Sequence, residues 1–316
     1  DHMYFVIMDP SLGRDAYEVR AIQDAVIYDI EARDIMVDTG ESQEREWRVD
    51  MAHTCTFTSY FDLLTSIRPD IEAAWENGTF FREAIRLEAG ELVGWVGAPN
   101  SLDFAVYDWE VVLPGFVNPS LYDYEPWKIH TVDPFPYFPT DVSEALLEKM
   151  VRTAEPRSGK IDHDINGRLA GNWFATGTRG YEGLETSYYW EGHLAIVPDA
   201  RDPDIWRFSI GNYNGEAANL AIRENSPDPR EVSVGSGMTS YELVTAKMYF
   251  VNDPDRPIQQ NTVILPPQDV VGTKVGDEVV AVALVEMLTD RSIKVEVFPG
   301  LDTAAGIEFT GAARTY

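Results

Sequence analysis

The chain has 316 residues, and its 53 acidic and 25 basic side chains give a formal net charge of −28. This charge repels phosphate backbones, so we expect no nucleic-acid partner, and the 44% hydrophobic content excludes a disordered chain. No apolar window approaches the roughly 18 residues of a membrane span, and no signal peptide is predicted in this chain.

Residues 1–112 are predicted to form a first domain rich in β-strands. Residues 17–22 and 25–30 are strand-like, and residues 45–59 alternate with the period of two that is typical of a half-buried strand. One face of this strand carries Trp47, Val49, Met51, His53, Cys55 and Phe57. Because Cys55 is the single cysteine and lies in this apolar run, we expect a buried, inert thiol.

Two helices and two further strands complete the predictions for this domain. Residues 61–67 look helical, and residues 69–76 form a helix with Pro69 in its first turn. Asn77-Gly78 ends that helix, because both residues tolerate a left-handed backbone. Strands are expected at 92–96 and 102–112.

The glycine-rich hairpin at 87–106 resembles the closing segment of lysostaphin-like zinc endopeptidases, and two further segments match the family in order. Residues 19–26 resemble its first element, and residues 49–53 with Tyr60 resemble its second. In the family the closing hairpin leads into a His-x-His strand that binds zinc. Here Asp103 and Ala105 stand near the positions of those histidines. The resemblance therefore implies a barrel-sandwich-hybrid-like domain that has lost the catalytic metal site.

The remaining candidates for zinc in this domain are His53, Asp103 and Asp9. Catalytic zinc needs about three protein ligands and an open position, and carboxylates in place of imidazoles weaken the case for zinc. A single histidine inside a strand is more often a packed, hydrogen-bonded residue than a ligand. We therefore interpret the domain as non-hydrolytic and expect no peptidase activity.

Residues 113–159 are predicted to connect the two domains. They contain many prolines and aromatic residues, Trp127 and Tyr137 among them, and one helix at 141–153. These aromatic side chains either staple the domains together or form a platform for a carbohydrate or peptide.

Residues 160–316 are predicted to form an antiparallel β-barrel. Gly171-Asn172-Trp173 resembles the opening of lipocalin-like barrels, in which the tryptophan closes the barrel base. Strands are expected at 187–190, 192–197, 205–211, 217–222, 238–249, 279–288 and 292–298, with a hairpin turn at 289–292. Six or seven strands of this kind suit a barrel or a sandwich, and a barrel of this size holds side chains or one small ligand.

The run from Asp162 to Gly167 matches the first half of a calcium-binding loop. Asp162, Asp164 and Asn166 supply the oxygen ligands that calcium prefers, but Trp173 stands where the completing acid belongs. The pattern therefore predicts either a calcium site that borrows a carboxylate or a plain Asx-rich turn. Asp199, Asp202 and Asp204 form a weaker candidate, interpreted as a solvated hairpin tip.

The sequence as a whole predicts a mainly β protein with two β domains and few short helices. The leading hypothesis is non-catalytic binding of a small molecule, a glycan or a cell-wall-like polymer, in an extracytoplasmic or secreted setting. The residues expected to bind it are Trp173, Tyr189, His193, Trp127 and Tyr137. One alternative is a hydrolase or isomerase that uses His193 or His53 with nearby carboxylates. Another is a structural subunit with a protein partner or a second copy of itself.

Overall fold

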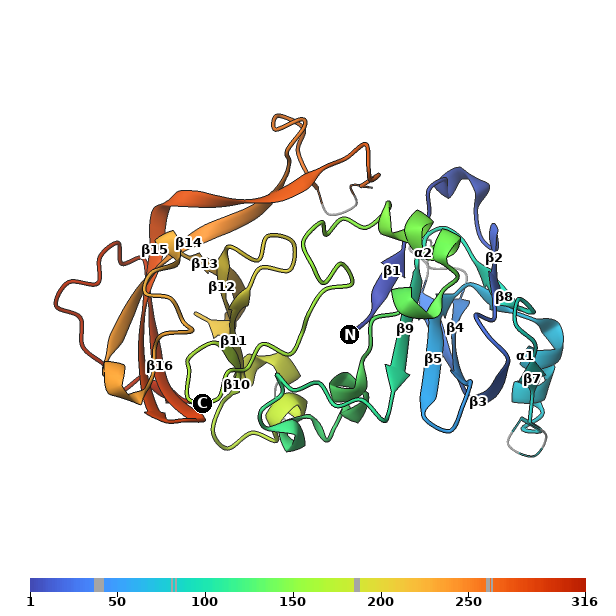
Figure 1. The fold of residues 1–316 in the computed structure, drawn as a ribbon, viewed down its shortest axis with the longest axis horizontal. Coiled ribbons are helices and arrows are strands. Elements are labelled where there is room, and N and C mark those ends of the chain that lie inside the picture. The colour runs from blue at the N-terminus through green and yellow to red at the C-terminus, as the bar shows by residue number, and fades with distance from the viewer. Residues whose placement is uncertain (37–42, 81, 83, 185–187, 260–261, 263) are drawn as a thin grey trace. The chain divides into compact units, whose positions relative to one another are not determined.

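A computed structural model describes residues 1–36, 43–80, 82, 84–184, 188–259, 262 and 264–316. The chain is mainly β, as predicted, and two curled sheets form its β domains (Figure 1). It divides into two compact units. Unit 1 comprises Asp1–Val112 and His130–Glu144, and unit 2 comprises Leu113–Ile129 and Ala145–Tyr316. The predicted connector is therefore shared between them. No helix in the described ranges is long and apolar enough to cross a membrane.

Unit 1 is built on an antiparallel sheet with the strand order β1-β9-β5-β4-β3-β7. Its strands are β1 (Met3–Phe5), β3 (Ala25–Met36), β4 (Gln43–Ala52), β5 (Phe57–Leu64), β7 (Arg86–Leu87) and β9 (Leu102–Asp108). A second sheet joins β2 (Tyr17–Arg20), β8 (Leu92–Val96) and β6 (Ser66–Ile67). The predicted helix with proline in its first turn is confirmed as α1 (Pro69–Glu76).

Three local predictions in unit 1 are wrong. The single strand at 45–59 ends at Ala52, and a tight turn follows, in which the amides of His53 and Thr54 both donate to the Phe57 carbonyl. Cys55 lies in this turn and is exposed, so the prediction of a buried thiol fails. The predicted helix at 61–67 is instead the end of β5 and the short β6, because β5 pairs with both β4 and β9.

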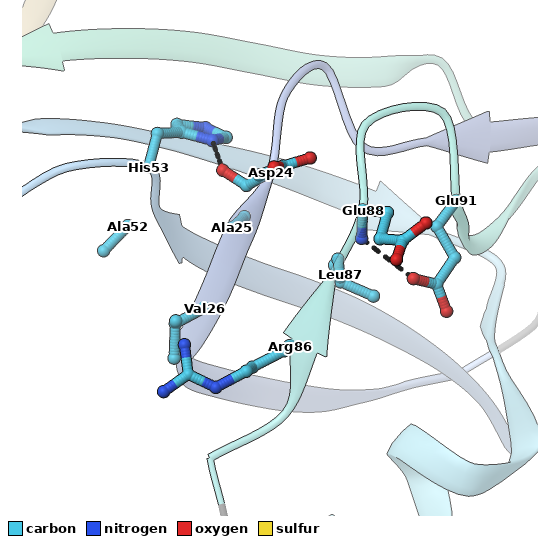
Figure 2. A pocket seen from close by; sticks show the side chains of 9 residues that line it. All are labelled: Asp24, Ala25, Val26, Ala52, His53, Arg86, Leu87, Glu88 and Glu91. Carbon is cyan, nitrogen blue, oxygen red and sulfur yellow. Dashed lines mark hydrogen bonds between the residues drawn. The ribbon is translucent and has the colours of Figure 1, made fainter.

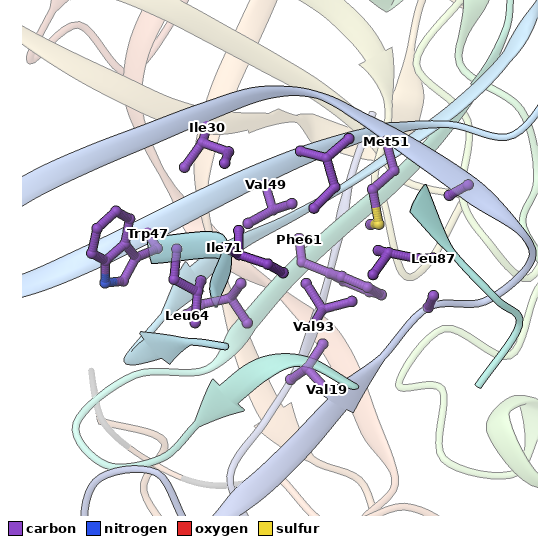
Figure 3. Close-up of a cluster of buried hydrophobic side chains, with 14 of the residues drawn as sticks. Val19, Ile30, Trp47, Val49, Met51, Phe61, Leu64, Ile71, Leu87 and Val93 are labelled. Carbon is purple, nitrogen blue, oxygen red and sulfur yellow. The ribbon is translucent and has the colours of Figure 1, made fainter. Parts of the chain in front are cut away.

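The core of unit 1 follows from the alternation along β4. Trp47, Val49 and Met51 point inward and are buried, as the period of two predicts. Figure 3 shows them packed against Phe61 and Leu64 of β5 and Ile71 of α1. Burying a side chain of this size contributes roughly 1.5–3 kcal/mol, so the cluster holds the two sheets and the helix together.

Unit 2 contains an eight-stranded antiparallel sheet in which strands that follow one another in the chain lie side by side. Its strands are β10 (Gly171–Phe174), β11 (His193–Pro198), β12 (Trp206–Tyr213), β13 (Glu216–Ile222), β14 (Thr239–Phe250), β15 (Val271–Thr289), β16 (Ser292–Pro299) and β17 (Arg314–Thr315). The hairpin turn predicted at 289–292 joins β15 and β16. Leu194, Phe208 and Tyr241 are among the fully buried side chains of its core.

Hydrogen bonds link the two edge strands of this curled sheet. Just beyond β10, the amide of Thr176 donates to the carbonyl of Thr315 in β17 at 2.8 Å. Arg291, in the β15–β16 turn, donates through Nη2 to the carbonyl of Asn172 in β10 at 3.1 Å. The first contact joins the segment after the edge strand β10 to the opposite edge strand β17, and the second ties β10 to the β15–β16 turn, so both hold the curl of the sheet.

The helices are short. The structure has α2 at Thr140–Leu147, so the helix predicted at 141–153 ends earlier. Its last carbonyl, of Leu147, accepts hydrogen bonds from Nη2 of Arg157 at 2.6 Å and from the amide of Met150 at 3.2 Å, so this helix end is satisfied. Short 3₁₀ helices are η1 (Pro10–Leu12), η2 (Pro119–Tyr122), η3 (Pro126–His130), η4 (Phe135–Tyr137), η5 (Gly180–Glu182), η6 (Tyr189–Gly192), η7 (Arg223–Asn225) and η8 (Val234–Ser236).

The strand predicted at 187–190 is wrong over its described part. Tyr189 and Trp190 belong to the 3₁₀ helix η6, and residue 187 lies outside the described residues. In this 3₁₀ helix, the side chains of both Tyr189 and Trp190 are exposed at the surface of unit 2.

Candidate functional site

An aromatic cluster gathers in unit 2 beside β10 and β11. Its members are Tyr122, Phe174, Tyr181, Tyr188, Tyr189, Trp190 and His193. The pairing of β10 with β11 sets Phe174 directly opposite His193. Tyr122 comes from η2, Tyr181 from η5, and Tyr189 and Trp190 from η6, with Tyr188 as the N-cap of η6. The cluster is therefore assembled from the sheet edge and from the loop that leads into it.

Two glycines allow η6 to lie close to its neighbours. Gly183 has a φ of +75°, and a Cβ there would lie 2.5 Å from the carbonyl oxygen of Tyr189. A Cβ on Gly211, in β12, would collide with the carbonyl oxygen of Trp190. Only glycine fits such close approaches, so these positions hold the backbone of η6 in place.

The outer part of the cluster is the aromatic platform, which we define as Tyr188, Tyr189 and Trp190. Tyr188 stacks on Trp190 with ring centroids 4.6 Å apart and planes at 11°, and Tyr189 meets Trp190 edge to face at 5.1 Å. The three side chains are 66%, 45% and 39% exposed, respectively. The platform thus offers rigid aromatic faces to solvent, because each ring is supported by another.

His193 packs against Tyr189 of the platform. Its ring lies 5.6 Å from Tyr189 and 5.0 Å from Tyr181, and its Nε2 donates to the Tyr181 carbonyl at 3.0 Å. Burial is the main cause that lowers the pKa of His193, and repulsion from Lys128 adds to it. The imidazole is therefore neutral near pH 7 and positions the tyrosines.

Charged side chains border the cluster in pairs. Lys128 Nζ lies 4.7 Å from the centre of the Tyr181 ring and 2.9 Å from Oε2 of Glu125. Arg179 Nη2 lies 2.6 Å from Oε1 of Glu182. These pairs provide hydrogen-bonding groups beside flat apolar faces, which is the combination that orients a polar ligand in a binding site.

The structure brings together two of the five predicted ligand-binding residues, Tyr189 and His193. Trp173 is buried in the core of the half-barrel, where its Nε1 donates to the Leu169 carbonyl. Trp127 lies on η3 and is half-buried. Tyr137 belongs to unit 1, where it stacks on Phe57 with ring centroids 4.5 Å apart.

Sequence reasoning missed Tyr188 and Trp190 because residues 187–190 were interpreted as a strand. A signal was present in the three consecutive aromatic residues. Side chains alternate between the two faces of a strand, so three neighbours cannot all be buried in the same core. A run of this kind at the edge of a sheet indicates that some of the rings are available for another contact.

The loop predicted to bind calcium is held by other groups of unit 2. Asp164 accepts hydrogen bonds from the amide of Asn172 at 2.7 Å and from Arg291 Nη2 at 3.0 Å. Asp162 accepts one from the Gly115 amide at 2.8 Å and pairs with Lys160 at 2.6 Å. The side chain of Asn166, by contrast, is exposed. Asp164 therefore ties the loop to β10 and to the β15–β16 turn, and Asp162 ties it to the segment at Gly115.

Across the described ranges, no three or more His, Cys, Asp or Glu side chains come together to hold a metal ion. Asp103 of the predicted zinc candidates accepts a hydrogen bond from the Tyr60 hydroxyl at 3.0 Å. Asp9 instead caps η1 by accepting the Ser11 amide at 3.0 Å. Calcium at the Asp162 loop stays a prediction.

Asp199 was predicted to lie at a solvated hairpin tip, and this is wrong. Its side chain is buried and accepts hydrogen bonds from the amides of Arg201 and Asp202 and from the Thr273 hydroxyl. These bonds lower its pKa against the opposing effect of burial, which is the largest single influence on it. Asp199 therefore anchors the loop between β11 and β12 to β15.

Unit 1 has an open pocket of about 660 Å³ at the ends of β3, β4 and β7. Figure 2 shows that its lining includes His53, Asp24, Glu88, Glu91 and Arg86. The Nδ1 of His53 lies 3.1 Å from the Asp24 carbonyl oxygen. Its Nε2 lies 2.8 Å from the Ser59 hydroxyl oxygen, but Ser59 is only 1% exposed. This serine is out of reach of a substrate, so the contact positions the histidine in its turn.

We expect the free energy of unfolding to fall as the pH drops below about 6.5, the ordinary pKa of histidine. Burial lowers the pKa of His53, His163 and His193 in the folded protein. Between the folded and unfolded pKa values the unfolded chain binds more protons, so this stability is present at higher pH and is lost on acidification. Urea unfolding from pH 5 to pH 8 measures the slope, and His193→Gln should flatten it for unit 2. An unchanged slope in this variant would contradict the assignment.

Comparisons with protein-family models, with curated proteins and with solved structures found no match for this chain. The resemblances to lysostaphin-like and lipocalin-like barrels therefore rest on the motifs named above. The function is argued below from the geometry of the aromatic platform.

Proposed function

We propose that this protein binds saccharide chains without chemically changing them, through the aromatic platform of unit 2. The observation that carries the proposal is the exposure of Tyr188, Tyr189 and Trp190, three consecutive residues at the start of the 3₁₀ helix η6, with Tyr188 as its N-cap. Aromatic rings stack on the apolar C–H faces of sugar rings, and neighbouring polar groups bond the hydroxyls. Tyrosine and tryptophan suit this role because they supply large, rigid contact areas at low entropic cost.

The platform is organised before any ligand arrives. Trp190 supports the ring of Tyr188, and Tyr181 and His193 support Tyr189. Side chains that are already ordered lose little conformational freedom on binding, so more of the contact energy is retained as affinity. The supporting histidine donates Nε2–H to the Tyr181 carbonyl at 3.0 Å, and this bond holds its ring in place against Tyr189.

The fold resemblances are part of the same proposal. The stacking of Arg291 on the Trp173 ring, at 4.3 Å, supports a lipocalin-like barrel whose tryptophan closes the base. In unit 1, the hydrogen bond from Tyr60 to Asp103 supports a lysostaphin-like barrel without peptidase chemistry. A protein that binds polysaccharide would work in an extracytoplasmic or secreted setting, where such polymers occur.

We expect Tyr188→Ala and Trp190→Ala each to weaken saccharide binding by roughly 30-fold, because the loss of a central aromatic contact costs about 2 kcal/mol. Isothermal titration calorimetry with cellohexaose and similar neutral oligosaccharides measures the affinity. Tyr28→Ala is the matched control, since Tyr28 is an exposed aromatic side chain of unit 1. Equal affinities in all three variants would show that the platform is not the binding site. If the unaltered protein did not bind these oligosaccharides, the proposed function would be wrong.

A further inference from the structure

The charge around the aromatic platform limits the kind of saccharide that it accepts. Each of the two cations beside the cluster already has an acidic partner: Lys128 pairs with Glu125, and Arg179 pairs with Glu182. Glu191 is half-buried on η6, directly after Trp190, and it makes no ion pair with any residue that the structure describes. The amide of Glu191 donates to the Tyr188 carbonyl at 3.0 Å, so this carboxylate belongs to the same short segment as the platform and would repel a polyanionic chain.

The rings themselves favour positive charge on the ligand. The faces of tyrosine and tryptophan rings attract cations, with a contribution of about 0.5–1 kcal/mol at an exposed site. One such contact already exists inside the cluster, between Lys128 and Tyr181. An ammonium group on a stacked sugar would contact the outer aromatic faces and would be attracted by the carboxylate of Glu191 on the same 3₁₀ helix.

We propose that the preferred ligand class is saccharides that carry amino groups, such as chains of β-linked glucosamine. This inference rests on the proposed function, because it assumes that sugars stack on the platform. It goes further by naming the charge of the ligand and by assigning Glu191 as the residue that selects it.

Three hexasaccharides with the same backbone test the inference. The glucosamine hexamer carries ammonium groups, cellohexaose carries hydroxyls in their place, and the hexamer of cellouronic acid carries carboxylates. At a pH low enough to protonate the amines, we expect the glucosamine hexamer to bind about fivefold more tightly than cellohexaose. Cellouronate should bind most weakly, and added salt should reduce both differences.

Glu191→Gln separates charge selection from a general effect on the fold. This variant should lose most of the preference for glucosamine, measured as the ratio of its affinities for the glucosamine hexamer and for cellohexaose. Glu308→Gln is the matched control, because Glu308 is an exposed acid of unit 2 far along the chain, and it should keep the preference.

Each outcome decides one proposal. Equal binding of the glucosamine hexamer and cellohexaose, or tighter binding of cellouronate, would overturn the inference while leaving saccharide binding intact. A preference for glucosamine that survives in Glu191→Gln would overturn the role of Glu191. Failure of all three hexamers to bind the unaltered protein would overturn the proposed function itself.

Discussion

Replacing Asp164 with alanine is expected to lower the free energy of unfolding of unit 2 by about 3–5 kcal/mol, the usual cost of breaking a buried ion pair. Asp164 is buried and accepts hydrogen bonds from Arg291 Nη2, from the Asn172 amide and, at 3.3 Å, from the Val117 amide. These contacts connect the loop at 162–167, strand β10 and the β15–β16 turn. Without the carboxylate, the two amides lose this acceptor, and Arg291 Nη2 keeps only the Asn172 carbonyl.

Arg291 is the main reason why we expect Asp164→Ala to lower the stability strongly. Nη1 of Arg291 is buried and has no hydrogen-bond partner within the described residues, so the guanidinium depends on Nη2 and on the Trp173 ring. A buried charge that has lost its counter-ion costs more than the pair contributed. The double variant Asp164→Ala with Arg291→Met should therefore be less destabilised than the sum of the two single variants.

Urea unfolding followed by intrinsic fluorescence measures this effect. Asp302→Ala is the control, because Asp302 is an exposed acid of the same unit, and it should stay within about 0.5 kcal/mol of the unaltered protein. If Asp164→Ala changed the free energy of unfolding by less than about 1 kcal/mol, the contacts of Asp164 with β10 and the β15–β16 turn would contribute little to stability. Melting in calcium and in EDTA extends the test, since a calcium-dependent shift that Asp164→Ala removes would place an ion at this loop.

Replacing Phe104 with alanine is expected to destabilise unit 1 by about 3–5 kcal/mol, the usual range for a buried phenylalanine. Phe104 lies on β9, between β1 and β5, and is buried against Phe61, with ring centroids 5.5 Å apart, and against Phe5 at 5.7 Å. Alanine would leave a cavity between strands that neighbouring side chains could fill only in part. Phe104→Leu should cost less, because it keeps more of the buried volume.

Each of these two substitutions should affect the unit in which the replaced residue lies. We expect Phe104→Ala to move the unfolding transition of unit 1 and Asp164→Ala to move that of unit 2, because each side chain packs within its own unit. Val6→Ala, on an exposed side chain of unit 1, is the control. If both substitutions moved one common transition equally, the units would unfold as a single cooperative body.

Local patterns predicted much of the secondary structure. The alternation along Trp47, Val49 and Met51 predicted strand β4 and its buried face, and the clean alternation at 293–298 predicted β16. Pro69 in the first turn predicted where α1 begins. These features depend on the backbone preferences of neighbouring residues, and neighbours are what a sequence displays directly.

Short apolar runs were ambiguous, and long-range pairing resolved them. The stretch from Phe61 to Ile67 has a composition that suits a helix or a strand. It became mostly strand because β4 and β9 lie on either side of β5 and take up its backbone hydrogen bonds. Cys55 became exposed for a related reason, since the chain turns at 53–56 to bring β5 against β4.

For the candidate site too, the sequence determined some features and the tertiary structure determined the others. The sequence alone determined the mainly β character, the acidic charge and the run of aromatic residues that contains Tyr189. Only the tertiary structure placed Tyr188 and Trp190 at the surface, because Gly183 and Gly211 allow the backbone of η6 to approach its neighbours. It also decided that Asp164 pairs with Arg291, 127 residues further along the chain. Contacts between residues so far apart depend on how the whole sheet curls, and no pattern among neighbouring residues encodes them.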